Sequence, residues 1–172
     1  MKLKYLLILP IVVYFLEGCN DNRTMVKTLQ SEINYLNKRN DSLEKEIQRV
    51  KPGLGDLMLA VQIHHNKLWF AGREDNWPLA QFEHDEIMEV LKQAEEIEKD
   101  RPEVKLLKSM IYPQMDTMQL AITQKNEEHF SVAFTNLTTA CNNCHSNTKF
   151  NFNKIVIPEH PPYSNQEYAP VK

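Results

Sequence analysis

Apolar side chains recur at alternating steps of three and four residues between Val26 and Val50, which constrains this part of the chain to a helix. In heptad notation the a positions are 26, 33, 40 and 47 and carry Val, Ile, Asn and Ile. The d positions are 29, 36, 43 and 50 and carry Leu, Leu, Leu and Val. β-Branched residues at a with leucine at d favour a parallel dimer, and the single Asn40 at an a position specifies its register. We therefore expect residues 26–50 to form a parallel homodimeric coiled coil. A long helix that packs on its own domain is the alternative.

The sequence Lys51-Pro52-Gly53 ends this segment, because proline and glycine interrupt helices. Helical apolar spacing then predicts four further helices, at about residues 54–71, 78–99, 104–125 and 127–145. Pro113 lies inside the third of these helices and should kink or divide it. The proline-rich residues 148–172 are expected to be extended and to pack on the bundle through Phe150, Phe152, Ile155, Val156 and Ile157.

The composition agrees with an all-α fold. The chain has only four glycines, and no alternating strand pattern of useful length precedes its C-terminal tail. The predicted architecture is a four-helix bundle preceded by an N-terminal coiled-coil helix. The formal net charge of −3 offers no basis for nucleic-acid binding.

The last predicted helix ends in Cys141-Asn142-Asn143-Cys144-His145, the C-x-x-C-H pattern of covalent c-type haem attachment. At helical spacing the two cysteines and the histidine share one face, so both thiols and the imidazole can reach one porphyrin. We expect one haem c, held by thioethers at Cys141 and Cys144, with His145 as the proximal iron ligand. A zinc site, a redox-active cysteine pair and a structural disulfide are the alternatives. The chain has no second cysteine pair to complete a zinc site.

The third cysteine, Cys19, follows an N-terminal export signal. A short basic start precedes an apolar run from Leu6 to Leu16, which is too short to span a membrane comfortably. Leu16-Glu17-Gly18-Cys19 is similar to a lipobox, although Glu17 departs from the usual small or apolar residue. We expect a signal peptide at 1–18, a lipidated Cys19 with the coiled coil at 19–51, a haem-binding bundle at 52–147 and the tail at 148–172. An ordinary signal peptide and an uncleaved anchor are the alternatives.

A four-helix segment with C-x-x-C-H near the end of its last helix resembles the class II c-type cytochromes, the cytochrome c′ class. The resemblance covers about residues 54–147 and implies a bundle with thioether-bonded haem and His145 beneath the iron. Segments 65–72, 76–80 and 161–166 also resemble a set of small bacterial haem proteins. The class varies at the sixth iron position, which some members leave vacant.

The resemblance implies that the first bundle helix covers the other haem face, and there this chain carries His64 and His65. Adjacent histidines point about 100° apart on a helix, so at most one of them faces the iron. We expect His65 as the distal ligand, with His64, Met58 or a vacant site as alternatives. His84, in the run Glu83-His84-Asp85-Glu86, is expected on a solvated helix face.

These features predict a monohaem one-electron carrier in the bacterial cell envelope. It would be membrane-anchored through lipid and would exchange electrons with redox partner proteins of the respiratory chain. If the sixth iron position is open, the expectation changes to a protein that binds or senses NO or CO. A third reading makes the haem domain an accessory of a larger respiratory or reductase complex. Nothing in the sequence indicates a substrate pocket with paired acid and base groups, so we expect no enzymatic activity.

Overall fold

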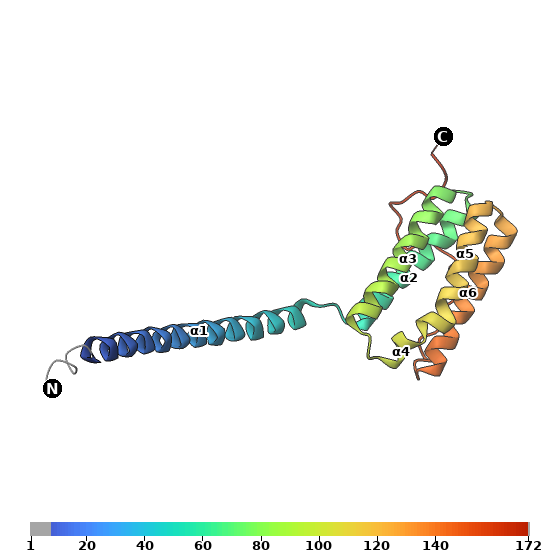
Figure 1. Ribbon diagram of the computed structural model, residues 1–172. Helices are drawn as coiled ribbons and strands as arrows, with labels where there is room; N and C mark the ends of the chain where they lie inside the picture. Colours follow the sequence, from blue (N-terminus) through green and yellow to red (C-terminus); the bar gives the residue numbers. More distant parts are fainter. Residues whose placement is uncertain (1–7, 172) are drawn as a thin grey trace, which may run out of the picture. The chain divides into compact units, whose positions relative to one another are not determined.

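The chain divides into two compact units, with the boundary between Lys51 and Pro52. The structure is a computed structural model that describes the backbone of residues 8–171 and the side chains of residues 22–171 (Figure 1). The expected signal peptide at residues 1–18 and the side chain of Cys19 therefore lie outside the described residues, in part or in full. Helix and irregular structure account for the described backbone, which contains no β-strand. Within it, no helix combines the length and apolar character needed to cross a bilayer.

The first unit contains the long helix α1, Ile8–Val50. The apolar a and d residues between Val26 and Val50 are between 47% and 70% exposed in this single chain. A stripe of this regularity is unusual on a solvated helix, because an exposed helix normally carries polar side chains all round. The structure thus leaves the heptad seam uncovered along its whole described length.

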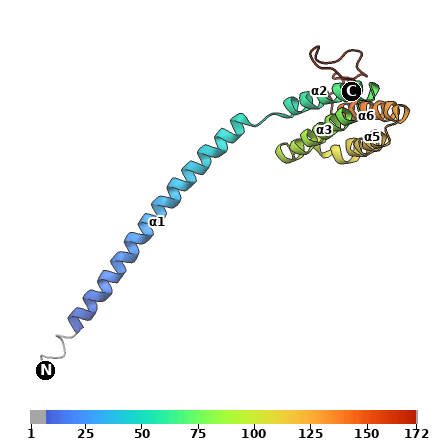
Figure 2. The same ribbon diagram turned by 90° about the horizontal axis from the view of Figure 1, so that it is seen from above.

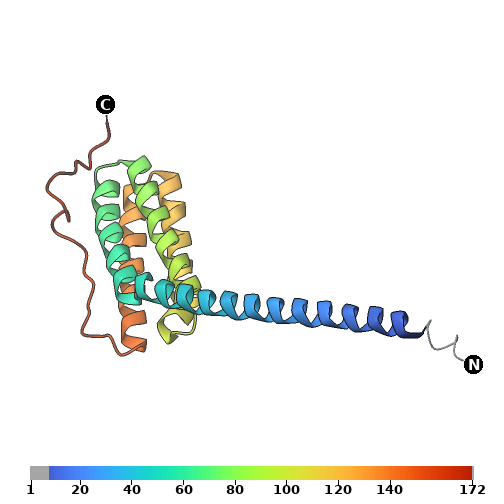
Figure 3. The same cartoon turned by 90° about the vertical axis from the view of Figure 1, so that its left-hand side faces the viewer.

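The second unit is a helical bundle of α2, α3, α5 and α6, which lie side by side (Figures 1 and 3). Helix α2 spans Leu54–Arg73, α3 spans Trp77–Ile97, α5 spans Tyr112–Gln124 and α6 spans Glu127–Asn147. The most deeply buried large side chains come from all four helices and include Leu68, Ile87, Leu91, Met115, Met118, Phe130, Phe134 and Leu137. Their helical spacing explains why these four segments fold together.

The segment predicted as one helix at 104–125 is divided. A short helix α4, Pro102–Lys105, is followed by the π-helical segment η1, Leu107–Ile111, and then by α5. Pro113 occupies the first turn of α5, where its missing N–H does not interrupt a helical hydrogen bond. The wider turn of η1 accommodates the register change before this proline.

After α6 the chain runs along the bundle without helix, from the end of α6 to the α2–α3 turn (Figures 2 and 3). Its main chain is held by asparagine side chains of the bundle. Asn142 bonds to Ile155, Asn66 donates to the carbonyl of His160, and Asn76 donates to the carbonyl of Tyr168. Asn76 also caps α3, because its side chain accepts from the Leu79 N–H.

The expectation that five apolar residues near the start of the tail pack on the bundle holds for Ile155, which is half-buried, and not for the other four. Phe152 is 78% exposed and Val156 is 64% exposed, and Phe150 and Ile157 are also exposed. Among the described residues of the tail, Tyr168 near the C-terminus has a buried side chain, which packs against Phe70. Hydrogen bonds to the tail main chain, together with the side chains of Ile155 and Tyr168, therefore hold the tail against the bundle.

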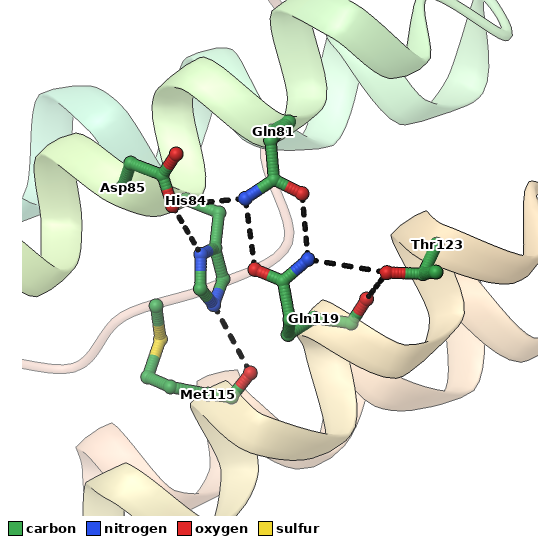
Figure 4. Close-up of polar contacts among 6 residues, drawn as sticks. All are labelled: Gln81, His84, Asp85, Met115, Gln119 and Thr123. Carbon is green, nitrogen blue, oxygen red and sulfur yellow. Dashed lines mark hydrogen bonds and ion pairs between the residues drawn. The ribbon is translucent and has the colours of Figure 1, made fainter.

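The expectation of a solvated face at residues 83–86 is also wrong. Glu83 and His84 are both buried, whereas the Asp85 side chain is 63% exposed. His84 Nε2 donates to the carbonyl of Met115 on α5 at 3.1 Å (Figure 4). Beside it, the side-chain amides of Gln81 and Gln119 donate to each other at 2.8 and 2.6 Å. Polar side chains can be buried here because their partners on other helices satisfy them.

Candidate functional site

Helix α6 places the three residues of the C-x-x-C-H pattern in its last two turns. Its buried face carries Phe130, Phe134 and Leu137, and continued helical spacing from these core residues leads to the cysteines. Cys144 is buried and Cys141 is half-buried, and both are free thiols. Burial raises the pKa of Cys141 to about 12 and also raises the pKa of Cys144, so both thiols are protonated near neutral pH.

A cavity of about 270 Å³ lies against this end of α6. Residues of α2, α3, α4, η1 and the start of the tail complete its wall. Most of the lining is apolar and includes Leu54, Met58, Val61, Ile87, Leu91, Val104, Leu107, Ile111, Leu137 and Ile155. Cys141, Cys144, His145 and His65 all line this one cavity. The fold thus brings His65 to the same site as three residues that lie 76 or more positions later in the sequence.

His145 makes one well-defined hydrogen bond, from Nδ1 to the main-chain carbonyl of Asn153, at 2.6 Å. A carbonyl oxygen only accepts, so Nδ1 carries a proton and Nε2 is the ring nitrogen that is left to bind a metal. Histidine ligands of metals commonly donate their second ring N–H to a carbonyl in this way, which fixes the tautomer and the ring orientation. The tail therefore holds His145 in the form that can bind iron.

The second histidine that lines the cavity, His65, is neutral because it is buried. It is only 4% exposed, and burial lowers its pKa to about 4. Its ring packs on Phe134 with centroids 4.3 Å apart, and its Nε2 lies 3.0 Å from the Thr138 hydroxyl. That hydroxyl donates its single proton to the Phe134 carbonyl, so it accepts from His65 Nε2–H. The lone pair of the His65 ring is therefore on Nδ1.

His64, the adjacent candidate, does not line the cavity. Its Nδ1 lies 2.7 Å from the carboxylate of Glu83 on α3, and Lys67 Nζ lies 2.6 Å from the other oxygen of that carboxylate. The two histidines thus face different neighbours, as the helical offset between adjacent residues requires. Met58 lines the cavity and is the remaining alternative among the distal candidates.

These residues fit a covalently bound haem. The cavity wall is apolar, two thiols and one imidazole reach it from the same helix end, and a second neutral imidazole reaches it from α2. Within the described residues, no three His, Cys, Asp or Glu side chains converge closely enough to hold a bare metal ion.

Three contributors to this site were not identified from the sequence. Thr138 lies seven residues before His145 on α6, so helical spacing could have pointed to it. Asn142 lies inside the C-x-x-C-H pattern, at a position where the pattern itself specifies no residue type. Asn153 contributes a main-chain carbonyl, for which no side-chain pattern exists.

Comparison of the chain with known protein families, with curated proteins and with solved structures finds no match. The interpretation of the site accordingly rests on its own residues.

Proposed function

We propose that this protein is a monohaem c-type cytochrome that carries one electron at a time in the bacterial cell envelope. The observation that carries the proposal is the convergence of Cys141, Cys144, His145 and His65 on one apolar cavity. The motif on the last helix of the bundle also supports membership of the cytochrome c′ class, which remains part of the proposal.

A haem bound here would supply a one-electron redox couple. Cys141 and Cys144 would hold it covalently, and His145 would bind its iron from the helix that carries both thioethers. If His65 is the second axial ligand, the pair of imidazoles places the potential below that of a cytochrome with one histidine and one methionine ligand. The packed core around Phe134 and Leu137 would keep water from the site and limit the rearrangement that accompanies electron transfer.

One observation favours the second candidate, a haem protein with an open sixth position that binds NO or CO. His65 Nε2 already donates to Thr138, so coordination through that nitrogen requires the ring to give up this hydrogen bond. Coordination through Nδ1 would retain it. The choice between the two functions therefore depends on whether a His65 nitrogen or an exogenous gas occupies the sixth coordination position of the iron.

The N-terminal sequence supports the placement in the cell envelope, because a basic start and an apolar run precede Gly18-Cys19. Cys19 would carry the lipid, and a parallel dimer through residues 26–50 would cover the exposed seam of α1. Redox proteins of the respiratory chain are the proposed partners of the second unit.

The test is the absorption spectrum of the purified holo-protein, oxidised and reduced, with and without CO, together with the mass of the intact chain. Covalent haem with sharp low-spin bands and no response to CO is the result expected for an electron carrier. A high-spin spectrum that changes with CO would replace it with the gas-binding function. A chain that carries no covalent haem after expression with a c-type maturation system would exclude both.

His65→Ala and His64→Ala form a matched pair for the distal ligand. Only the first substitution should convert the low-spin spectrum to a high-spin one. If His65→Ala stays low-spin, His65 is not the ligand, and Met58→Ala is the next variant.

A further inference from the structure

The side-chain amide of Asn142, inside the C-x-x-C-H pattern, pairs with the main chain of the tail. Asn142 Nδ2 donates to the carbonyl of Ile155, and the N–H of Ile155 donates to Asn142 Oδ1, both at 2.8 Å. Two bonds to the two main-chain groups of one residue fix its orientation as well as its position, as pairing in a β-ladder does. Asn142 therefore sets where residue 155 lies relative to α6.

The same short segment is held at its other end by the end of α6. The N–H of Phe150 donates to the carbonyl of His145 at 2.7 Å, and Lys149 adopts the left-handed conformation with φ 67°. This is the hydrogen-bond pattern of a Schellman motif, which turns the chain back along the helix. A further bond from the Asn153 N–H to the Phe150 carbonyl, at 2.8 Å, closes a turn within the segment.

Asn153 lies between these two attachments, and its carbonyl accepts the Nδ1–H of His145 at 2.6 Å. Residues 150–155 thus form a clasp, with Phe150 bound to the end of α6 and Ile155 bound to Asn142. The carbonyl that orients the imidazole belongs to the clasp and not to the helix. Its position therefore depends on both attachments.

We propose that Asn142 is a positioning residue for the proximal imidazole and acts through this clasp. The inference rests on the proposed function, because it assigns His145 as the iron ligand. With the clasp intact, the carbonyl of Asn153 accepts a hydrogen bond from the Nδ1–H, which makes the imidazole a stronger electron donor to the iron. A stronger donor favours the oxidised haem and lowers the potential. Without the Asn142 bonds, residues 153–155 are free to move, and water replaces the carbonyl.

The chain offers a matched control, because Asn143 is the other unspecified residue of the pattern and is exposed. Full-length Asn142→Ala and Asn143→Ala are each prepared with haem, and the midpoint potential is measured by equilibrium titration. We expect Asn142→Ala to change the ratio of oxidised to reduced protein at a fixed potential by on the order of tenfold, a rise of about 59 mV for one electron. Asn143→Ala should match the unsubstituted protein.

A second measurement separates positioning of the imidazole from simple attachment of the tail. Hydrogen exchange followed by NMR reports the Ile155 amide in the haem-free chain and the His145 Nδ1–H in the reduced holo-protein. Both protons should exchange faster in Asn142→Ala and not in Asn143→Ala. Asn142→Asp keeps the acceptor for the Ile155 N–H but loses the donor, so the exchange of both protons should be intermediate between the unsubstituted chain and Asn142→Ala. The Asn142→Asp variant also tests the inference if the alanine variant does not attach haem.

Faster exchange at Ile155 with an unchanged potential and an unchanged Nδ1–H would overturn the inference and leave Asn142 as a tail attachment only. In that outcome the haem is present and the proposed function stands. An unsubstituted chain that carries no covalent haem would instead overturn the proposed function, and the inference with it.

Discussion

The imidazole of His64 lies 2.7 Å from the carboxylate of Glu83, which has no exposed surface. The contact joins α2 to α3. His65, the next residue, lines the cavity instead, because adjacent residues of a helix point about 100° apart. The two histidines of α2 therefore serve different contacts, one with a buried carboxylate and one with the cavity.

Replacement of Glu83 tests this junction. Lys67 and His64 contact its two oxygens, so Glu83→Gln leaves the Lys67 ammonium without its buried counter-charge. We expect the free energy of unfolding to fall by about 3 kcal/mol, as for other broken buried ion pairs. Denaturant unfolding followed by circular dichroism measures the change.

Glu86→Gln is the control for this substitution. Glu86 is 34% exposed at its side chain and lies 3.8 Å from His64 Nε2, so its loss should cost less than about 1 kcal/mol. Equal effects of the two substitutions would show that burial does not increase the contribution of the Glu83 ion pair to the free energy of unfolding.

Gly72 is a second test of the packing. A Cβ atom at this position would overlap the ring of Phe130, which has no exposed surface. Gly72→Ala should therefore destabilise the second unit by about 1–3 kcal/mol, although alanine favours helix over glycine. Thermal unfolding measures the effect against Gly55→Ala, where nothing lies within 4 Å of the added atom. Gly55→Ala should be neutral or stabilising, and a similar loss in both variants would contradict the packing argument.

The stability of the haem-free chain should depend on His65 in acid. Burial lowers its pKa to about 4 from the ordinary value of 6.5, so the unfolded chain binds more protons between these pH values. The contribution of neutral His65 to the free energy of unfolding should therefore be at its full value above pH 6.5. It should be lost as the pH approaches 4, which lowers the free energy of unfolding by up to about 3 kcal/mol.

Denaturant unfolding of the haem-free chain at pH 7 and pH 4.5 measures this dependence. His65→Leu should lose much less stability over that range than the unsubstituted chain. His129→Gln removes an exposed histidine and should behave like the unsubstituted chain. If the His65→Leu profile is unchanged, burial of the imidazole is not what couples folding to acid.

The seam of α1 predicts self-association. Leu36 at a d position is 55% exposed and Tyr35, outside the seam, is 59% exposed, so a monomer would respond similarly to their loss. In a parallel dimer Leu36 packs against its copy and Tyr35 does not. Leu36→Ser should weaken the dimer about tenfold or more, and Tyr35→Ser should leave it unchanged. Sedimentation equilibrium of the full chain measures both, and a monomer at all concentrations would rule out the coiled coil.

Local patterns located most of the helical framework. Apolar spacing predicted a helix at 54–71, and the structure has α2 at Leu54–Arg73. The predicted last helix, 127–145, corresponds to α6 at Glu127–Asn147. The effect of Pro113 was expected as a kink or a break, but the π-helical turn η1 was not. The prediction of a solvated face at residues 83–86 was wrong, because the sequence shows that a side chain is polar but not which partners it finds in the fold.

The sequence by itself determined the helices and the common face of Cys141, Cys144 and His145, because helical periodicity is a property of neighbouring residues. It also determined the apolar seam of α1. Only the tertiary structure decided that His64 pairs with Glu83 while His65 reaches the cavity, and that His145 donates to Asn153. These contacts depend on where distant elements pack, and a carbonyl or a buried carboxylate becomes a partner only once the chain has folded around it.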